Sequence, residues 1–278
     1  MSWHPHGHYL SLGKGQAHLV DHGQGPVALL LHGFLHSSWT WRAQIEELAR
    51  DHRVIAPDLP GFGRTDAEHE DHSLEGLAGS LRALLKRLGV RRLALCAGNS
   101  LGGALACSLA LDPSLAVERV ALSNPYLLPL PLPSLGFRLL GLEPFAPLFR
   151  ATAGNERFRR WALRAAAYGQ VSGEVLAGFR HLDRPGSHRA ACVTAAELAR
   201  GVKSLRSRLK ALRAPTLLAW GERDRLLAGR YGRRVEKLLP RARCVRFSHS
   251  GHCPHEEEPA RFNALLRELL SRSSPAGS

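Results

Sequence analysis

The sequence predicts an α/β protein built on a mostly parallel, doubly wound sheet. Six short, continuous apolar segments recur along the chain, and segments of helical periodicity lie between most of them. Apolar runs of this length, without polar alternation, are typical of strands buried on both faces of a sheet. Because strands that alternate with helices form parallel sheets, the order of these segments indicates the fold class.

Each predicted element corresponds to one of these segments. Strands are expected at residues 26–32, 53–58, 92–97, 117–123, 215–220 and 242–247. Helices are expected at residues 41–50, 74–88, 100–111, 230–239 and 259–271. In the helix at 74–88, leucines recur at steps of three and four residues, which forms one apolar stripe that can pack on the sheet. Residues 9–20 alternate more weakly and predict an antiparallel hairpin at the sheet edge.

The alternation of strands and helices stops between residues 123 and 215. This stretch is too long for a simple crossover and predicts an insertion. Residues 127–149 are apolar and punctuated by proline, whereas residues 156–168 and 171–182 have the pattern of short helices. We therefore expect a core formed by residues 1–125 and 214–278. Residues 126–213 are expected to form an inserted helical lid, or cap, and a connecting helix.

Composition excludes several classes of protein. The chain has 278 residues, 44% of them hydrophobic and 22% charged, which is typical of a globular protein with a large core. Its five cysteines are an odd number without close pairing, as expected for reduced thiols. Residues 1–14 contain no apolar stretch of signal-peptide length, and no run elsewhere approaches the roughly 18 apolar residues that a membrane span requires. We expect a cytoplasmic protein without stable membrane insertion.

The formal net charge of +14 raises the question of a nucleic-acid partner. The basic residues are mostly arginines spread over the whole length, and no nucleic-acid motif accompanies them. We therefore expect a solvated basic surface and no nucleic-acid partner. The sequence leaves the oligomeric state open.

The motif Gly98-Asn99-Ser100-Leu101-Gly102 follows a predicted strand and opens a predicted helix. In this context a G-x-S-x-G match indicates a nucleophilic serine on a tight, strained turn. The helix start after the turn offers free N–H groups to a developing oxyanion.

A serine hydroxyl needs a histidine base and a carboxylate that orients it. Asp224 follows the strand at 215–220, and His252 follows the last strand. Since parallel strands place their sites at their carboxyl ends, serine, acid and histidine are expected at one sheet edge. Glu222 is a competing acid, whereas Asn124, at the end of the strand at 117–123, cannot be the anion.

The histidines and the cysteine at 249–255 could also be interpreted as a metal cluster. No second ligand set with zinc spacing accompanies them, so we expect neither a metal nor a cofactor.

Five ordered motifs resemble the alpha/beta-hydrolase family. They are L-L-H-G-F at 30–34, D-L-P-G-F-G at 58–63, G-N-S-L-G-G at 98–103, W-G-E-R-D at 220–224 and G-H-C-P at 251–254. The resemblance implies an alpha/beta-hydrolase fold in which Ser100 is the nucleophile, Asp224 the acid and His252 the base. It also implies an oxyanion hole formed by the backbone N–H groups of Phe34 and Leu101. The basic amphipathic helix at 197–213 matches a helix that family members pack on the sheet.

A serine nucleophile is unlike the aspartate of the haloalkane dehalogenase and epoxide hydrolase branches. The expected activity is hydrolysis of carboxylic esters, with a small-molecule, lipophilic ester as substrate, and the sequence has some similarity to pheophytinase-like esterases. Carbon-carbon bond hydrolysis of the meta-cleavage type, perhydrolase or haloperoxidase activity, and a catalytically idle ligand-binding fold stay open. Candidate substrate contacts are His36, Trp39, Leu127, Phe137 and Phe145.

Overall fold

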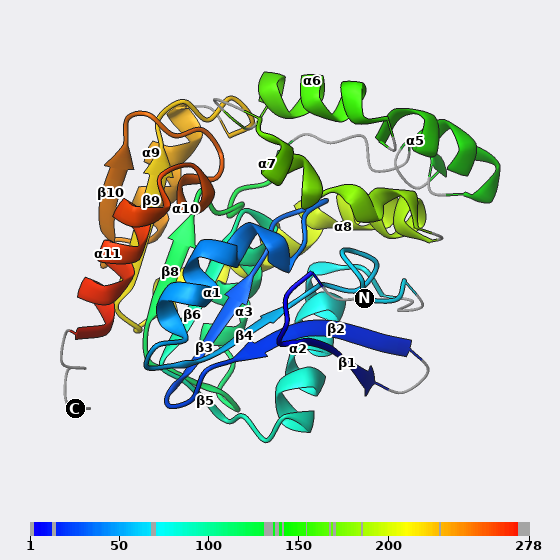
Figure 1. Ribbon diagram of the computed structural model, residues 1–278. Coiled ribbons are helices and arrows are strands. Elements are labelled where there is room, and N and C mark those ends of the chain that lie inside the picture. Colours follow the sequence, from blue (N-terminus) through cyan, green and yellow to red (C-terminus); the bar gives the residue numbers. More distant parts are fainter. Residues whose placement is uncertain are drawn as a thin grey trace.

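An eight-stranded sheet forms the centre of the molecule (Figure 1). The computed structural model describes residues 3–12, 15–67, 71–130, 136, 139–140, 142–153, 155–166, 168, 171–184, 186–227 and 229–271. The strand order is β1-β2-β4-β3-β6-β8-β9-β10, and β2 alone runs against the others. The strands are β1 (Gly7–Leu12), β2 (Gly15–His22), β3 (Val27–Leu31), β4 (Arg53–Pro57), β6 (Leu95–Asn99), β8 (Val120–Ser123), β9 (Thr216–Gly221) and β10 (Arg243–Phe247).

The predicted α/β class and mostly parallel sheet are confirmed. The antiparallel hairpin expected at residues 9–20 is the β1–β2 pair at the sheet edge. Two predicted strands are each divided, because their first residues form a small separate sheet of β5 (Arg92–Leu93) and β7 (Ala116–Val117). The backbone then joins the main sheet, where Ala94 N donates to Val27 O at 2.8 Å.

Helices cover both faces of the sheet. One core contains side chains from α2 (Leu74–Arg87), α3 (Leu101–Ala110) and α9 (Gly229–Leu238). A second core contains side chains from the short helix η1 (Ser38–Trp41), from α1 (Arg42–Leu48), which follows it directly, and from α11 (Pro259–Ser271). The strand β3 supplies Leu29 to the first core and Leu30 to the second, as the alternation of side chains along a strand requires.

The segment between β8 and β9 carries the inserted helices. They are η2 (Glu143–Phe145), α5 (Ala146–Ala153), α6 (Glu156–Ala166), α7 (Gly173–Ala177), η3 (Arg180–Asp183), α8 (Ser187–Arg208) and η4 (Leu209–Ala211). Figure 1 shows α5 and α6 at the outer edge of the molecule, with α7 and α8 between them and the sheet. Among the helices in the described ranges, none combines the length and the apolar content needed to cross a bilayer.

The basic helix predicted at 197–213 differs from the observed one. The helix α8 begins earlier, at Ser187, and ends at Arg208. Its apolar stripe, which includes Leu198, Val202 and Leu205, is buried as expected. However, α8 packs against α2 and α3, because these helices already lie on that face of the sheet.

Candidate active site

Ser100 occupies the sharp turn between β6 and α3. Its backbone angles are φ 51° and ψ −113°, in a region that non-glycine residues rarely adopt. A Cβ at Gly98 would collide with the Gly102 carbonyl, and a Cβ at Gly102 would collide with the Leu31 carbonyl. The two glycines of the motif are therefore required for this turn. Ser100 N donates to Ser123 O at 3.1 Å, which fixes the turn to the end of β8.

His252 and Asp224 are hydrogen-bonded at the same edge of the sheet. His252 Nδ1 donates to Asp224 Oδ2 at 2.8 Å, and both side chains are buried. The backbone N–H groups of Leu226 and Leu227 donate to the other carboxylate oxygen at 2.8 and 2.9 Å. These bonds fix the orientation of the carboxylate and, through it, of the imidazole ring.

Asn124 is a site residue whose role the sequence did not reveal. Its side-chain nitrogen donates to Asp224 Oδ2 at 2.6 Å, and its side-chain oxygen accepts from Gly221 N at 2.8 Å. Burial acts to raise the pKa of Asp224. The charge and hydrogen bond of His252, with the hydrogen bonds from Leu227 and Asn124, outweigh burial and hold that pKa below its usual value. Asp224 therefore stays ionised.

The loop after β3 lies directly against the serine turn. A Cβ at Gly33 would lie 2.6 Å from Asn99 Oδ1 and 3.3 Å from Ser100 Cβ. His32 orients this loop, because its Nδ1 donates to Gly33 O at 2.8 Å and its Nε2 accepts from Leu59 N at 2.9 Å. Burial lowers the pKa of His32 to about 4, so the ring is neutral, as this pair of bonds requires.

Asn99 connects the serine turn with the histidine loop. Its side-chain nitrogen donates to Ser123 O and to His252 O, both at 3.0 Å. The residue preceding Ser100 is thus bonded to the backbone of His252. The backbone N–H of Leu101 belongs to the first turn of α3, where N–H groups have no partner within the helix. A serine at this turn and an imidazole held by a carboxylate are the groups that general-base activation of a hydroxyl requires.

Glu256, whose side chain is only 1% exposed, lies on the short helix α10 (Pro254–Glu257) that follows His252. Glu256 pairs with Arg42 and accepts hydrogen bonds from Tyr168 Oη at 2.7 Å and Thr40 Oγ1 at 3.1 Å. Burial acts to raise its pKa, but the hydrogen bond and charge of His36 and the charge of Arg42 hold it at about 2. This network joins the inserted segment, through Tyr168, to the helix next to His252.

The predicted substrate contacts have different surroundings. His36 Nε2 lies 3.0 Å from Tyr168 Oη, and Trp39 Nε1 donates to Glu174 O at 2.7 Å, so both bind the inserted segment. Leu127 is fully buried in the core, whereas Phe145 is exposed. Phe137 lies outside the described residues.

The competing residues lie apart from this hydrogen-bonded pair. Glu222 is exposed, and the carboxylate that His252 contacts is that of Asp224. His249 is exposed and contacts Arg223, whereas His255 is buried between Thr40 and Ser123. Within the described part of the chain, no group of three or more histidine, cysteine or acidic side chains could hold a metal ion.

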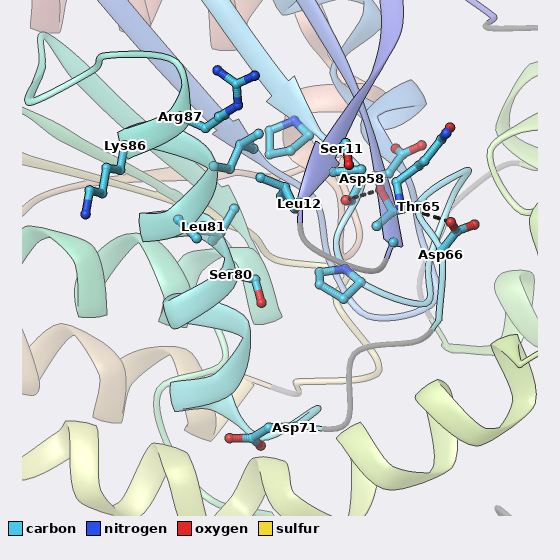
Figure 2. Close-up of a pocket in the computed structure, with 17 residues that line it drawn as sticks. Ser11, Leu12, Asp58, Thr65, Asp66, Asp71, Ser80, Leu81, Lys86 and Arg87 are labelled. Atoms are coloured by element: carbon cyan, nitrogen blue, oxygen red, sulfur yellow. Dashed lines mark hydrogen bonds between the residues drawn. The ribbon is translucent and has the colours of Figure 1, made fainter.

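A cavity of about 950 Å³ lies between the β1–β2 hairpin and α2 (Figure 2). Its lining includes Leu12 from β1, Ser80 and Leu81 from α2, and Asp66 and Asp71 from the segment between β4 and α2. None of its lining residues belongs to the serine turn or to the Asp224–His252 pair, so it is separate from the candidate active site.

Comparison with known proteins agrees with this architecture. A family model described as alpha/beta hydrolase fold matches residues 26–259. The 2-hydroxy-6-oxo-2,4-heptadienoate hydrolase of Pseudomonas putida is 30% identical to this chain, with 95% of this chain and 96% of that protein aligned. The 2-hydroxy-6-oxo-6-phenylhexa-2,4-dienoate hydrolase of Burkholderia cepacia is 28% identical, over 94% and 93% of the two chains.

Among solved structures, a thermophilic esterase from Thermogutta terrifontis superimposes with a TM-score of 0.78 at 25% identity. The superposition covers 95% of this chain and 97% of the esterase. The similar proteins thus include hydrolases of different bond types on one fold.

Proposed function

Because the chain belongs to the alpha/beta hydrolase fold family, we propose that it is a serine hydrolase that cleaves carboxylic esters through an acyl-enzyme. The observation that carries this proposal is the 2.8 Å hydrogen bond between His252 and an ionised Asp224, at the sheet edge that carries the strained Ser100. A carboxylate-oriented imidazole next to an elbow serine is the arrangement that acyl transfer uses.

In the proposed reaction, His252 Nε2 accepts the proton of the Ser100 hydroxyl as Oγ attacks the ester carbonyl carbon. Asp224 keeps the proton of His252 on Nδ1 and stabilises the imidazolium. The backbone N–H groups of Phe34 and Leu101 donate to the oxyanion of the tetrahedral intermediate. Its collapse expels the alcohol, which takes the proton from His252. Water then attacks the acyl-enzyme by the same route and releases the acid.

We further propose that residues 126–213 form a lid domain over a lipophilic ester. Support comes from the contacts that hold this segment to the rest of the molecule: Tyr168 with Glu256, Trp39 with Glu174, and Ser37 Oγ with Gly178 O at 3.0 Å. Under this proposal the substrate lies between the serine turn and the lid. His36, Trp39, Leu127, Phe137 and Phe145 remain candidate contacts.

Hydrolysis of a carbon-carbon bond is the second candidate function. It is favoured by the two relatives named as dienoate hydrolases, which align with nearly the whole chain. The same serine, histidine and oxyanion donors would serve either bond. The two reactions differ in the leaving group. Ester cleavage expels an alkoxide, whereas carbon-carbon cleavage expels a carbanion equivalent, and each must be protonated as it leaves.

Two measurements test the proposal. A fluorophosphonate probe should label the wild-type protein and leave Ser100→Ala unlabelled, and that variant should lose ester turnover by a factor on the order of 10⁶. An inert wild-type protein that is folded by circular dichroism would instead indicate an idle ligand-binding fold. A comparison of kcat/KM for nitrophenyl esters with kcat/KM for a 2-hydroxy-6-oxo-dienoate then identifies whether the protein cleaves an ester bond or a carbon-carbon bond. A clear preference for the dienoate would replace the ester assignment by the second candidate.

A further inference from the structure

Most of the large apolar side chains that are exposed among the described residues belong to the inserted segment. Of the nine that are exposed among the described residues, seven lie between positions 139 and 161, and an eighth is Leu226. We call these eight residues the cap face: Leu139, Leu140, Leu142, Phe145, Leu148, Phe158, Trp161 and Leu226. Figure 1 shows α5 and α6, which carry three of them, along the edge of the molecule opposite β5. Exposed large apolar side chains concentrated in one segment of the chain indicate an interaction site.

The helix α6 presents two different faces. Leu163 packs inward against Tyr168, Val171 and their neighbours, whereas Phe158 and Trp161 point away from that cluster. Trp161 is 65% exposed, and its ring centroid lies 5.7 Å from that of Phe158. The outward aromatic pair is therefore not needed for the packing of the insert.

Four arginines line a groove together with Trp161. A groove of about 410 Å³ is lined by Arg157, Arg160, Trp161, Arg164, Ala165 and Arg225. Arg160 pairs with Glu156 at 3.2 Å and donates to Val171 O at 2.8 Å. In the part of the chain that the structure describes, no hydrogen bond or ion pair engages the other three arginines. Like charges gathered in this way repel one another unless an anion lies between them.

We propose that the cap face and this arginine groove dock the protein on the surface of an anionic lipid bilayer. The charge of the groove complements phosphodiester headgroups, which guanidinium groups bind bidentately. Trp161 lines the same groove as these arginines and contacts Phe158, and aromatic side chains of this kind favour the interface between headgroups and acyl chains. An exposed tryptophan that shares a groove with four arginines fits this boundary, where aromatic rings and guanidinium groups are both satisfied.

Docking in this orientation brings the bilayer close to the candidate active site. Arg225 follows Asp224 directly in the chain, so the groove adjoins the loop that carries the carboxylate. A lipophilic molecule that leaves the bilayer would enter at this side. The docking itself does not depend on the proposed ester hydrolysis, because it concerns residues outside the serine turn and is measured as binding.

The test is co-sedimentation with vesicles of an equal mixture of phosphatidylcholine and phosphatidylglycerol, compared with pure phosphatidylcholine. The wild-type protein should bind the mixed vesicles preferentially and dissociate at high salt. Its tryptophan emission should shift to the blue on binding, and the shift should disappear in Trp161→Ala. Each arginine near an anionic surface changes the partition coefficient about fivefold, so Arg157→Gln with Arg164→Gln should lower it about 30-fold.

The matched control is Arg87→Gln with Arg91→Gln, which removes the same charge from exposed positions outside both the cap face and the arginine groove. An equal loss of binding in the control would reduce the effect to general attraction of a basic protein, and the proposal would fail. It would also fail if binding showed no preference for phosphatidylglycerol. A dimer in light scattering that Trp161→Ala dissociates, without vesicle binding, would assign the cap face to a second copy of the chain instead.

Discussion

Asn124 and His252 share one oxygen of Asp224. The Asn124 side-chain nitrogen lies 2.6 Å from Asp224 Oδ2, and His252 Nδ1 lies 2.8 Å from the same atom. Asn124 also accepts a hydrogen bond from Gly221 N and has a φ of 41°, in the left-handed region that asparagine tolerates better than most residues. One amide side chain thus joins the end of β8 to the end of β9 and orients the carboxylate between them.

Substitution of Asn124 should affect catalysis through Asp224. A hydrogen bond to a charged group contributes about 1.5–3 kcal/mol, so Asn124→Ala should lower kcat roughly ten- to hundredfold with little change in KM. Asn124→Asp places a second carboxylate beside Asp224 and should move the acid limb of the pH–rate profile to higher pH. Unchanged kcat in a folded Asn124→Ala variant would contradict the positioning role.

The two carboxylates after β9 should differ strongly in effect. Asp224→Asn should lower kcat on the order of 10⁴-fold, because an amide stabilises the wrong tautomer of His252. Glu222→Gln is the matched control, since it neutralises an exposed carboxylate two residues away. Steady-state kinetics on one ester decide between them. If Glu222→Gln had the larger effect, the acid would be Glu222.

Glu256 should make folding stability depend on pH. Its pKa is about 2 in the folded protein and 4.5 ordinarily. A lowered folded-state pKa stabilises the protein fully above the unfolded-state pKa, and this contribution is lost as pH falls from about 4.5 towards 2. Glu256→Gln should lower the free energy of unfolding at neutral pH by about 3 kcal/mol, because it leaves Arg42 without its buried partner.

The measurement for Glu256 is denaturant unfolding at several pH values. The stability of Glu256→Gln should fall less steeply than that of the wild type below pH 4.5. The control is Glu75→Gln, since Glu75 is 69% exposed in its ion pair with Arg82 and should change stability by about 1 kcal/mol or less. Parallel acid limbs for wild type and Glu256→Gln would contradict the low pKa.

Acyl-chain length should affect the specificity constant if the lid holds a lipophilic ester. Each methylene buried in an apolar pocket contributes up to about 0.8 kcal/mol, so kcat/KM should rise up to about fourfold per carbon until the pocket is full. Nitrophenyl esters from acetate to dodecanoate, kept below their micelle concentrations, provide the measurement. A steady fall from acetate onward would exclude the preference for medium chains.

Local patterns predicted the architecture well. Buried strands of a parallel sheet leave continuous apolar runs, so β3, β4, β9 and β10 lie close to their predicted bounds. The turn at Ser100 was equally predictable, because the glycines at 98 and 102 mark the motif, and a Cβ at Gly98 would collide with the turn's own backbone at Gly102. The order of serine, acid and histidine follows from where each strand ends.

Other features depend on which distant segments meet. The sequence alone excludes Asn124 as the catalytic carboxylate. Its hydrogen bond to Asp224 arises only because β8 and β9 are neighbours in the sheet. Glu256 has the sequence context of a surface helix. It is buried because Thr40 and Arg42, from the segment that follows β3, and Tyr168, from the inserted segment, satisfy its charge and oxygens.

The inserted segment shows most clearly which features depend on the local sequence and which depend on tertiary contacts. The sequence determined that residues 127–149 are apolar and that α6 is a basic helix, since composition and periodicity are local properties. Only the tertiary structure decided that Leu127 lies in the core whereas Leu148 and Trp161 face outward. The hydrophobic effect favours burial of apolar area without direction, so the tertiary packing determines which of these side chains are buried.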